Sequence, residues 1–234
     1  MVSPLVIAKL IIGDSNLVRP REAVARLVGA DGDADIDPGS AFWRGAPRIV
    51  ADGDFYGHAV PNHRTEILLQ YTPANFYLLF ICPYERLHLK PDPVITEETY
   101  KLWNWDVAEV FIGADFDNIR LYKEFEVSPQ GEWVDLDVNL DNPPHETGWV
   151  WKSGMKVAAR IDAPNRIWYG YMRIPWQSIS DREPRPGSRY RINFYRCQGA
   201  GPDRKYIAWQ PVNRLSFHTP ECFGTLMLVE PQGF

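Results

Sequence analysis

The chain has 234 residues, of which 45% are hydrophobic and 24% charged, so it is long enough for one or two globular domains and unlike a disordered chain or a coiled coil. Its net charge of −5, without a long basic run, argues against nucleic acid and against an anionic membrane surface as partners. No stretch approaches the roughly 20 consecutive apolar residues of a transmembrane helix, so no membrane partner is expected.

The N-terminal segment, residues 1–30, is predicted to be an extension packed on a single domain formed by residues 31–234. Its first residues are mildly apolar, but Lys9 interrupts them and no Ala-x-Ala-like cleavage site follows, so the pattern does not predict a signal peptide. A cytoplasmic protein is expected if this start is correct. The stretch EAVARLVG (22–29) is a candidate helix.

An acidic run, DGDADID, follows at residues 31–37. The alternating carboxylates of Asp31, Asp33, Asp35 and Asp37 offer hard oxygen ligands, which suit calcium. The run lacks the full pattern of an EF-hand loop, so a solvated acidic loop is the alternative. A structural calcium ion is therefore the one cofactor that we consider.

Most of the remaining chain alternates between apolar and polar residues with a period of two, which is typical of β-strands. Pro- and Gly-rich turns separate the segments, and no Gly/Ser-rich linker or repeat divides them. The pattern predicts an all-β fold, an antiparallel β-sandwich of jelly-roll type, with short helices only, at 22–29, 95–103 and near 176–179. The predicted strands are 65–72, 76–82, 107–113, 120–128, 133–140, 156–162, 167–175, 190–197, 205–209 and 224–229.

Aromatic residues are the main functional clue, with 9 Trp, 11 Tyr and 11 Phe. Trp133 lies on the polar side of the alternating segment WVDLDVNL, beside Asp135, and is therefore predicted to be exposed. Trp103 and Trp105 approach a predicted strand and are flanked by polar residues. Exposed aromatic rings beside carboxylates and amides fit a sugar, whose C–H face packs on a ring while its hydroxyls bind at the edge.

Other chemistries have no signature. The three cysteines, Cys82, Cys197 and Cys222, form no C-x-x-C, and their odd number does not suggest a disulfide framework. The sequence has no G-x-S-x-G, no phosphate-binding loop and no H-E-x-x-H, so we expect no organic cofactor and no zinc signature. The five histidines lie far apart in sequence, and each is expected to have a surface or structural role.

From WNWDVAEVF (103–111) onward the chain resembles carbohydrate-binding module family 9, in the broad sense that includes family-9-like domains. The resemblance continues through LYKEFEVSPQGEW (121–133), MRIPW (172–176), RINFYR (191–196), IAW (207–209) and TPECFGTL (219–226), and covers roughly residues 31–230. It implies a non-catalytic β-sandwich that binds a sugar ring between two aromatic side chains. It also implies plant polysaccharide or oligosaccharide ends as ligands, association with xylanases, structural calcium and an extracellular location.

The aromatic and acidic anchors of that family match this sequence in type. The first clamp tryptophan precedes the D-x-x-E segment, which corresponds to Trp103 before Asp106, and the sugar-binding glutamate that ends the segment is Glu109. The second clamp tryptophan corresponds to Phe217, three residues before Pro220. Phe217 offers less stacking area than tryptophan.

The polar rim departs from the family. Arg214 stands where the family has an asparagine, Glu126 where it has an arginine, and Tyr195 where it has a glutamine. These differences favour a different ligand, or a domain that has lost sugar binding and serves protein interaction. Glu109 shares a strand face with Val107 and Phe111. The structural alternative to sugar binding by Glu109 is an ion pair with Arg or Lys. A glycoside hydrolase that uses Glu109 with Glu124 or Glu126 is the catalytic alternative.

Overall fold

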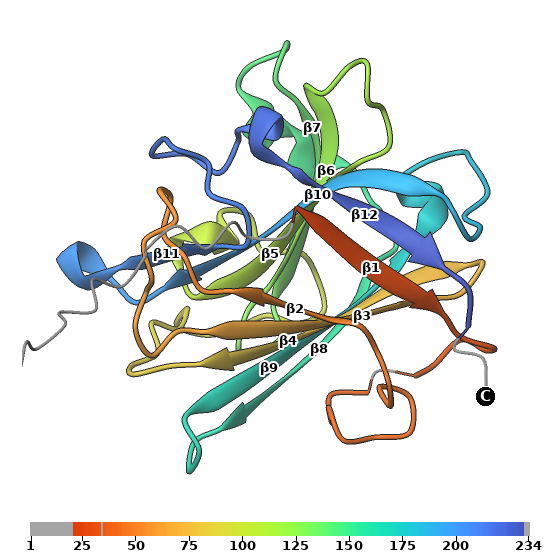
Figure 1. Ribbon diagram of the computed structural model, residues 1–234. Coiled ribbons are helices and arrows are strands. Elements are labelled where there is room, and N and C mark those ends of the chain that lie inside the picture. The colour runs from red at the N-terminus through yellow and green to blue at the C-terminus, as the bar shows by residue number, and fades with distance from the viewer. Residues whose placement is uncertain (1–20, 34, 232–234) are drawn as a thin grey trace, which may run out of the picture.

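The computed structural model describes residues 21–33 and 35–231 (Figure 1), so residues 1–20 of the predicted extension lie outside the described residues. Nearly all of its regular structure is strand, and the predicted all-β fold is confirmed. The strands are β1 (Glu22–Leu27), β2 (Arg48–Ala51), β3 (Thr65–Tyr71), β4 (Asn75–Pro83), β5 (Val107–Gly113), β6 (Leu121–Val127), β7 (Trp133–Asn139), β8 (Lys156–Asp162), β9 (Ile167–Pro175), β10 (Arg189–Gln198), β11 (Lys205–Ala208) and β12 (Gly224–Val229).

Short 3-10 turns are the only helical elements among the described residues, and none of them is long and apolar enough to cross a membrane. The turn expected near 176–179 is present. The turns are η1 (Leu102–Asn104), η2 (His145–Val150), η3 (Trp176–Ser178), η4 (Gly201–Asp203) and η5 (Pro220–Cys222).

The strands form one continuous sheet that folds over into two layers (Figure 1). The order is β7-β6-β5-β10-β12-β1-β3-β4-β9-β8, with β11 added beside β10 and β2 beside β3. The sheet is not wholly antiparallel, because β1 pairs in parallel with both β12 and β3. Through β1 the two layers become parts of the same hydrogen-bonded sheet.

The helix predicted at 22–29 was wrong, because residues 22–27 are β1. Ala23 and Ala25 are buried in the main core, and their spacing of two puts both on the same face of a strand. Pairing with β12 and β3 overrides the helix propensity of alanine. The helix predicted at 95–103 is reduced to η1, since Lys101 adopts a left-handed conformation with φ of 62° directly before it.

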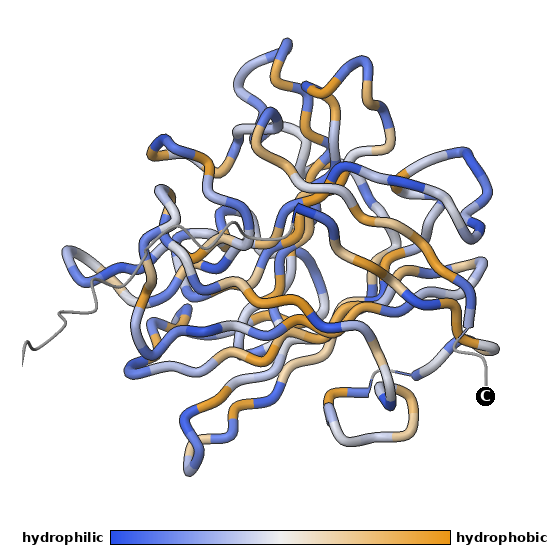
Figure 2. Tube along the Cα trace, viewed as in Figure 1, coloured by the Kyte–Doolittle hydropathy of each residue, from blue (hydrophilic) through white to orange (hydrophobic). Residues whose placement is uncertain are grey.

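Three hydrophobic clusters hold the molecule together. The largest fills the space between the layers and includes Phe80, Phe125, Trp168 and Phe194. A second covers the outer face of β3, β4 and β9, where Trp43 packs. Figure 2 shows hydrophobic residues along the central strands and more hydrophilic ones in the outer loops. The third cluster lies on the outer face of β5, β6, β7 and β10, and it supports the site described below.

Strand β7 corrects the prediction of an exposed Trp133. Val134, Leu136 and Val138 share one face as expected, and they belong to the third cluster. The first half of the opposite face is also covered, because Trp133 packs against the main core and Asp135 is buried, whereas Asp137 and Asn139 are exposed as expected. The Asp135 carboxylate accepts a hydrogen bond of 2.6 Å from the Ser153 hydroxyl, which explains how a polar residue is accommodated there.

Candidate functional site

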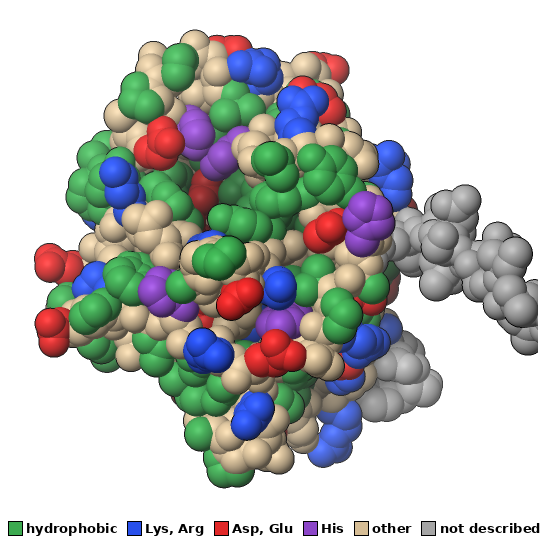
Figure 3. All heavy atoms as spheres, turned by 90° about the vertical axis from the view of Figure 1, so that its left-hand side faces the viewer, with side chains coloured by type: hydrophobic (Ala, Val, Ile, Leu, Met, Phe, Trp, Pro, Cys, Tyr) green, Lys and Arg blue, Asp and Glu red, His purple; other side chains and the backbone are tan. Residues whose placement is uncertain are grey.

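A cavity of about 770 Å³ opens over the outer face of β5, β6 and β10. The 3-10 turns η1 and η2, the segment 200–206 and the segment 215–218 surround it. Figure 3 shows a hollow on this side of the molecule, with acidic atoms deep between hydrophobic side chains and histidines at its edge. The cavity therefore combines aromatic walls with a charged floor, as pockets for polar ligands do.

Strand alternation places the floor residues. In β5, the side chains of Ala108, Val110 and Ile112 point into the main core, so Glu109 points to the cavity side together with Val107 and Phe111. The expected shared face of these three residues is confirmed.

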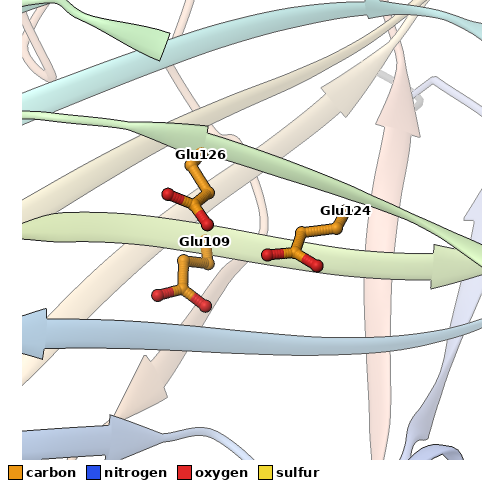
Figure 4. A group of neighbouring side chains, drawn as sticks. All are labelled: Glu109, Glu124 and Glu126. Atoms are coloured by element: carbon orange, nitrogen blue, oxygen red, sulfur yellow. The ribbon is translucent and has the colours of Figure 1, made fainter. Parts of the chain in front are cut away.

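Glu124 and Glu126 occupy the same face of the neighbouring strand β6, because Phe125 and Val127 point into the core. Glu126 stands directly opposite Glu109 in the antiparallel ladder, and Glu124 stands opposite Phe111. One carboxylate oxygen from each of Glu109, Glu124 and Glu126 lies within 4.8 Å of the others (Figure 4). We call these residues the three-glutamate cluster.

Burial dominates the electrostatics of this cluster. Desolvation raises the pKa of Glu109 to about 7, although the Cys197 thiol donates a hydrogen bond of 3.2 Å to its Oε1. Desolvation and the neighbouring Glu109 raise the pKa of Glu124 to about 8, and the same two causes raise the pKa of Glu126 well above its usual range. Without a bound cation, the cluster therefore holds protons at neutral pH.

The ion pair of Glu109 with Arg or Lys, considered as the alternative to sugar binding, is absent from the described residues. Arg204 is the nearby basic side chain on the cavity wall, but its guanidinium is used elsewhere. It donates hydrogen bonds to the backbone carbonyls of Trp103 at 2.5 Å, Trp105 at 3.1 Å and Gly199 at 2.8 Å. Arg204 therefore fixes the loop that carries Trp103. Its charge also lowers the pKa values of Glu109 and Glu126, but too little to offset their burial.

The aromatic walls come from Trp103 on η1 and Phe217 in the loop before η5. Phe217 stacks on Tyr195, with ring centroids 4.1 Å apart and an interplanar angle of 18°, and contacts Phe55 at 5.0 Å. Trp103 is met edge-on by Tyr100 at 5.7 Å. Packing against other aromatic rings thus restricts both wall residues, so their side chains lose little conformational entropy when a ligand binds.

A histidine pair forms part of the rim. His218 Nδ1 lies 2.7 Å from the Tyr122 hydroxyl, and its Nε2 lies 2.9 Å from Nε2 of His145. Burial lowers the pKa of His218 to about 3, and the neighbouring His145 adds to this shift, so His218 is neutral at physiological pH. Both ring nitrogens of His218 are thus engaged with Tyr122 and His145, and His218 contributes an uncharged ring to the rim of the cavity.

The structure brings together only some of the residues predicted to bind sugar. Trp103, Glu109 and Phe217 line one cavity. Glu126 is fully buried behind Glu109, so it does not reach the cavity wall. Tyr195 is buried beneath Phe217, and its hydroxyl donates to the Phe217 carbonyl at 3.2 Å. It therefore supports the wall.

Two further predicted residues lie outside the cavity lining. Arg214 is exposed and precedes the lining residues Leu215 and Ser216. Trp105 packs on His88, with ring centroids 4.6 Å apart, and His88 rather than Trp105 faces the cavity. Sequence reasoning did not assign Arg204, His145, His218, Phe55 or Tyr206 to the site.

The acidic run behaves as a hydrogen-bonded loop. Asp31 Oδ1 accepts hydrogen bonds from Thr72 at 2.5 Å, Asn75 at 2.9 Å and Tyr77 at 2.6 Å, which lower its pKa. The Asp35 side chain accepts from the backbone of Asp37 at 3.0 Å. No three carboxylates of Asp31, Asp33, Asp35 and Asp37, all of them described, lie within the spacing of one cation. Calcium at this loop stays a prediction.

Comparison with known proteins supports the resemblance found in the sequence. The model of carbohydrate-binding family 9 matches residues 160–228. A protein of Arthroderma benhamiae named "Extracellular protein" is 25% identical over 182 residues, which cover 72% of this chain and 80% of that protein.

Two solved structures share the fold. A protein from Bacteroides uniformis, to which carbohydrate binding is ascribed, superposes with a TM-score of 0.69 at 16% identity, over 88% of this chain and 98% of that chain. A family 9 carbohydrate-binding module from Caldicellulosiruptor kristjanssonii in complex with cellotriose superposes with a TM-score of 0.63 at 12% identity, over 90% of this chain and 95% of that chain. The resemblance to carbohydrate-binding module family 9 and the predicted β-sandwich are thereby confirmed.

Proposed function

We propose that the chain is a non-catalytic carbohydrate-binding domain whose cavity holds a sugar ring of a mono- or oligosaccharide between Trp103 and Phe217. The observation that carries this proposal is that these two aromatic side chains and the Glu109 carboxylate line the same cavity of about 770 Å³. Aromatic walls stack on the C–H faces of the ring, and a buried carboxylate accepts hydrogen bonds from hydroxyl groups. Together they supply both halves of sugar recognition.

The polar contacts come from a different set of residues than the resemblance implies. Arg214 and Tyr195 lie off the cavity lining, whereas His145, His218 and Asn104 lie on it. Asn104 can donate and accept hydrogen bonds from sugar hydroxyls, and so can the Nδ1 atom of His145, whereas both ring nitrogens of His218 are already paired with Tyr122 and His145. A changed rim on a retained aromatic slot favours a sugar or linkage that differs from cellotriose, the ligand of the Caldicellulosiruptor module.

Biological context follows from the relatives. Since the Arthroderma relative is named an extracellular protein, we infer an extracellular location. Plant polysaccharide or oligosaccharide ends are the ligand class that the resemblance to family 9 implies. A role beside xylanases fits that ligand class.

The glycoside hydrolase alternative has weaker support. The carboxylates of the three-glutamate cluster converge on one point of the floor, and Glu126 is buried behind the cavity wall. A glycosidase needs two carboxyl groups that flank the bond to be cleaved, one on each side. The arrangement therefore favours binding over hydrolysis.

Calorimetric titration tests the proposal, with glucose, cellotriose, xylobiose and their reduced alditols as ligands. We expect binding by the intact chain, and Trp103→Ala should weaken it at least about tenfold, the equivalent of ~1.4 kcal/mol. Phe116→Ala is the matched control, because Phe116 is an aromatic residue with 48% of its surface exposed and does not line the cavity.

Absence of heat with every sugar, from folded protein, would contradict the proposal and favour the protein-interaction alternative. Release of reducing sugar from xylan by the intact chain, abolished in Glu109→Gln, would instead establish the hydrolase. Loss of binding to the alditols alone would show recognition of a free reducing end.

A further inference from the structure

The three-glutamate cluster is an energetically costly arrangement. Glu109, Glu124 and Glu126 are 2%, 3% and 0% exposed, and Figure 4 shows their carboxylates turned toward one another from adjacent strands. Glu109 and Glu126 are directly opposed in the β5–β6 ladder. Like charges at such positions destabilise a sheet, and a buried carboxylate is costly unless it is paired.

The cluster lacks the partners that would normally offset this cost. No Lys or Arg in the described part of the chain forms an ion pair with any of the three glutamates. His218 Nε2 lies 4.0 Å from Glu124 Oε2, but burial lowers the pKa of His218 to about 3, so it carries no charge that could offset the carboxylate. No described residue outside the cluster donates a hydrogen bond to either carboxylate oxygen of the fully buried Glu126, and the same is true of Glu124 Oε2. The only hydrogen bond available to Glu126 among these residues is a proton shared with the neighbouring carboxyl of Glu124. Two side chains that are more than nine-tenths buried thus point unpartnered oxygen atoms at one shared position.

We propose that Glu109, Glu124 and Glu126 form a binding site for one divalent cation that prefers oxygen ligands, such as Ca²⁺ or Mn²⁺. A cation between the carboxylates supplies the missing partner for all of them at once. The three carboxylates fit this class because they are hard ligands, whereas a site for a soft metal would use thiolates.

The spacing of the ligand atoms agrees with this assignment. One oxygen of each glutamate lies within 4.8 Å of the others. Two oxygens bound to the same Ca²⁺ are at most about 4.8 Å apart, since each bond is about 2.4 Å long. The side chains therefore need only small adjustments to close on a cation. The acidic run at residues 31–37 offers no comparable group of three converging carboxylates.

The position of the cluster also gives the cation a role. Glu109 and Glu124 line the cavity, whereas Glu126 lies behind it, so the open side of the site faces the cavity. The remaining coordination positions of the cation are then filled by water or by sugar hydroxyls. This last step rests on the proposed sugar binding, but the cation site itself does not.

Titration with Mn²⁺ tests the site without any sugar. The full chain is treated with EDTA, the chelator is removed, and Mn²⁺ is added at neutral pH while the electron paramagnetic resonance signal of the free ion is followed. We expect one bound Mn²⁺ per chain, displaced by Ca²⁺, and an increase in Tm when either ion is present, because an ion that binds the folded state stabilises it.

Variants locate the ion. Glu126→Gln and Glu124→Gln should each weaken Mn²⁺ binding at least about 10-fold, since even loss of an outer-shell partner costs that much. The metal-free Glu126→Gln protein should also have a higher Tm than the metal-free parent, because one buried acidic group has been removed. Glu221→Gln, at an exposed glutamate of η5, is the matched control and should bind Mn²⁺ like the parent.

Three results would overturn the assignment. The parent protein binds no Mn²⁺ or Ca²⁺ at millimolar concentration, or both glutamine variants bind as the parent does, or binding is lost in Asp33→Asn/Asp35→Asn. Failure of this proposal is distinct from failure of the proposed function, since sugar binding is measured by a separate titration in EDTA and in Ca²⁺. Sugar binding that is equal in EDTA and in Ca²⁺ would refute the role of the cation in sugar recognition, whereas the cation site itself is decided by the Mn²⁺ titration.

Discussion

Arg204 offers the sharpest test of how the site is built. Its guanidinium donates to the backbone carbonyls of Gly199 at 2.8 Å, Trp103 at 2.5 Å, Asn104 at 3.3 Å and Trp105 at 3.1 Å. Residues 102–104 form only one 3-10 turn, so little else in the backbone fixes their position. We predict that Arg204→Ala loosens this loop and with it the Trp103 wall.

The size of the effect follows from these bonds. A hydrogen bond from a charged donor contributes about 1.5–3 kcal/mol net. Arg204 is itself half-buried. We therefore expect the free energy of unfolding to fall by about 3–4 kcal/mol, less than the sum of the separate bonds. The free energy of unfolding of Arg204→Lys should lie between those of the parent and of Arg204→Ala, because an ammonium group cannot reproduce the planar fork of donors.

Equilibrium unfolding in urea measures this loss, and calorimetry with the sugar that binds most tightly measures the effect on Trp103. Arg160→Ala is the control, since Arg160 is exposed and lies 4.3 Å over the Tyr169 ring, a contact worth less than about 1 kcal/mol. If Arg204→Ala lowers the free energy of unfolding no more than this control does, Arg204 does not hold the loop as described. In Arg204→Ala the sugar affinity should also fall about tenfold, because Trp103 is no longer held in place by its loop.

Further predictions concern pH and the core. In EDTA, the free energy of unfolding should fall from pH 6.5 to 8. The glutamates of the cluster have raised pKa values, so over this range the folded state retains protons that the unfolded state has lost. Each retained proton gives a slope of about −1.4 kcal/mol per pH unit. His218, whose pKa is lowered, contributes only below about pH 6.5, so a flat or rising profile above that value would refute the electrostatics of the cluster. Burial raises the pKa of Asp135 to about 6, so Asp135→Asn should raise the free energy of unfolding above pH 6 by about 1–3 kcal/mol and leave it unchanged near pH 4, as measured by urea unfolding. Trp176→Ala should lower the free energy of unfolding by about 3–5 kcal/mol, because the buried indole stacks on Phe76 at 5.2 Å and donates to the Thr72 carbonyl at 3.0 Å. A shift in the urea midpoint equivalent to less than about 1 kcal/mol would contradict the role of Trp176 in the core.

Most strands could be predicted from the sequence because period-two alternation is a local property. The bounds of β5, β8, β9 and β12 agree with the prediction to the residue. Strands β1 and β2 were missed for physical reasons. The alanines of β1 suit a helix equally well, and β2 has only four residues. Only the strands on either side decide their conformation.

The site could be predicted only where its residues belong to local motifs. Trp103 and Glu109 stand six positions apart in one segment, and Phe217 precedes a recognisable ending, so the sequence pointed to all three. Arg204 and the histidine pair come from loops, and His145 and His218 are 73 positions apart, so no spacing connects them.

The three-glutamate cluster is an intermediate case. The alternation of Glu124 and Glu126 already places both on one face of a strand. What the sequence could not supply is the register of β5 against β6, which sets Glu109 opposite Glu126. Register depends on the whole sheet, and a shift by one residue would have sent Glu109 into the main core.

The placement of β1 has a consequence for the order of assembly. The strand lies between β12 and β3, so its partners are residues 224–229 on one side and residues near 70–71 on the other. During synthesis, one edge of β1 must remain open until almost the whole described chain has left the ribosome. A nascent or truncated chain that lacks β12 exposes that edge, and the edge can then accept the β12 of another molecule. Strand exchange between neighbouring copies is therefore the characteristic misassembly of this sheet.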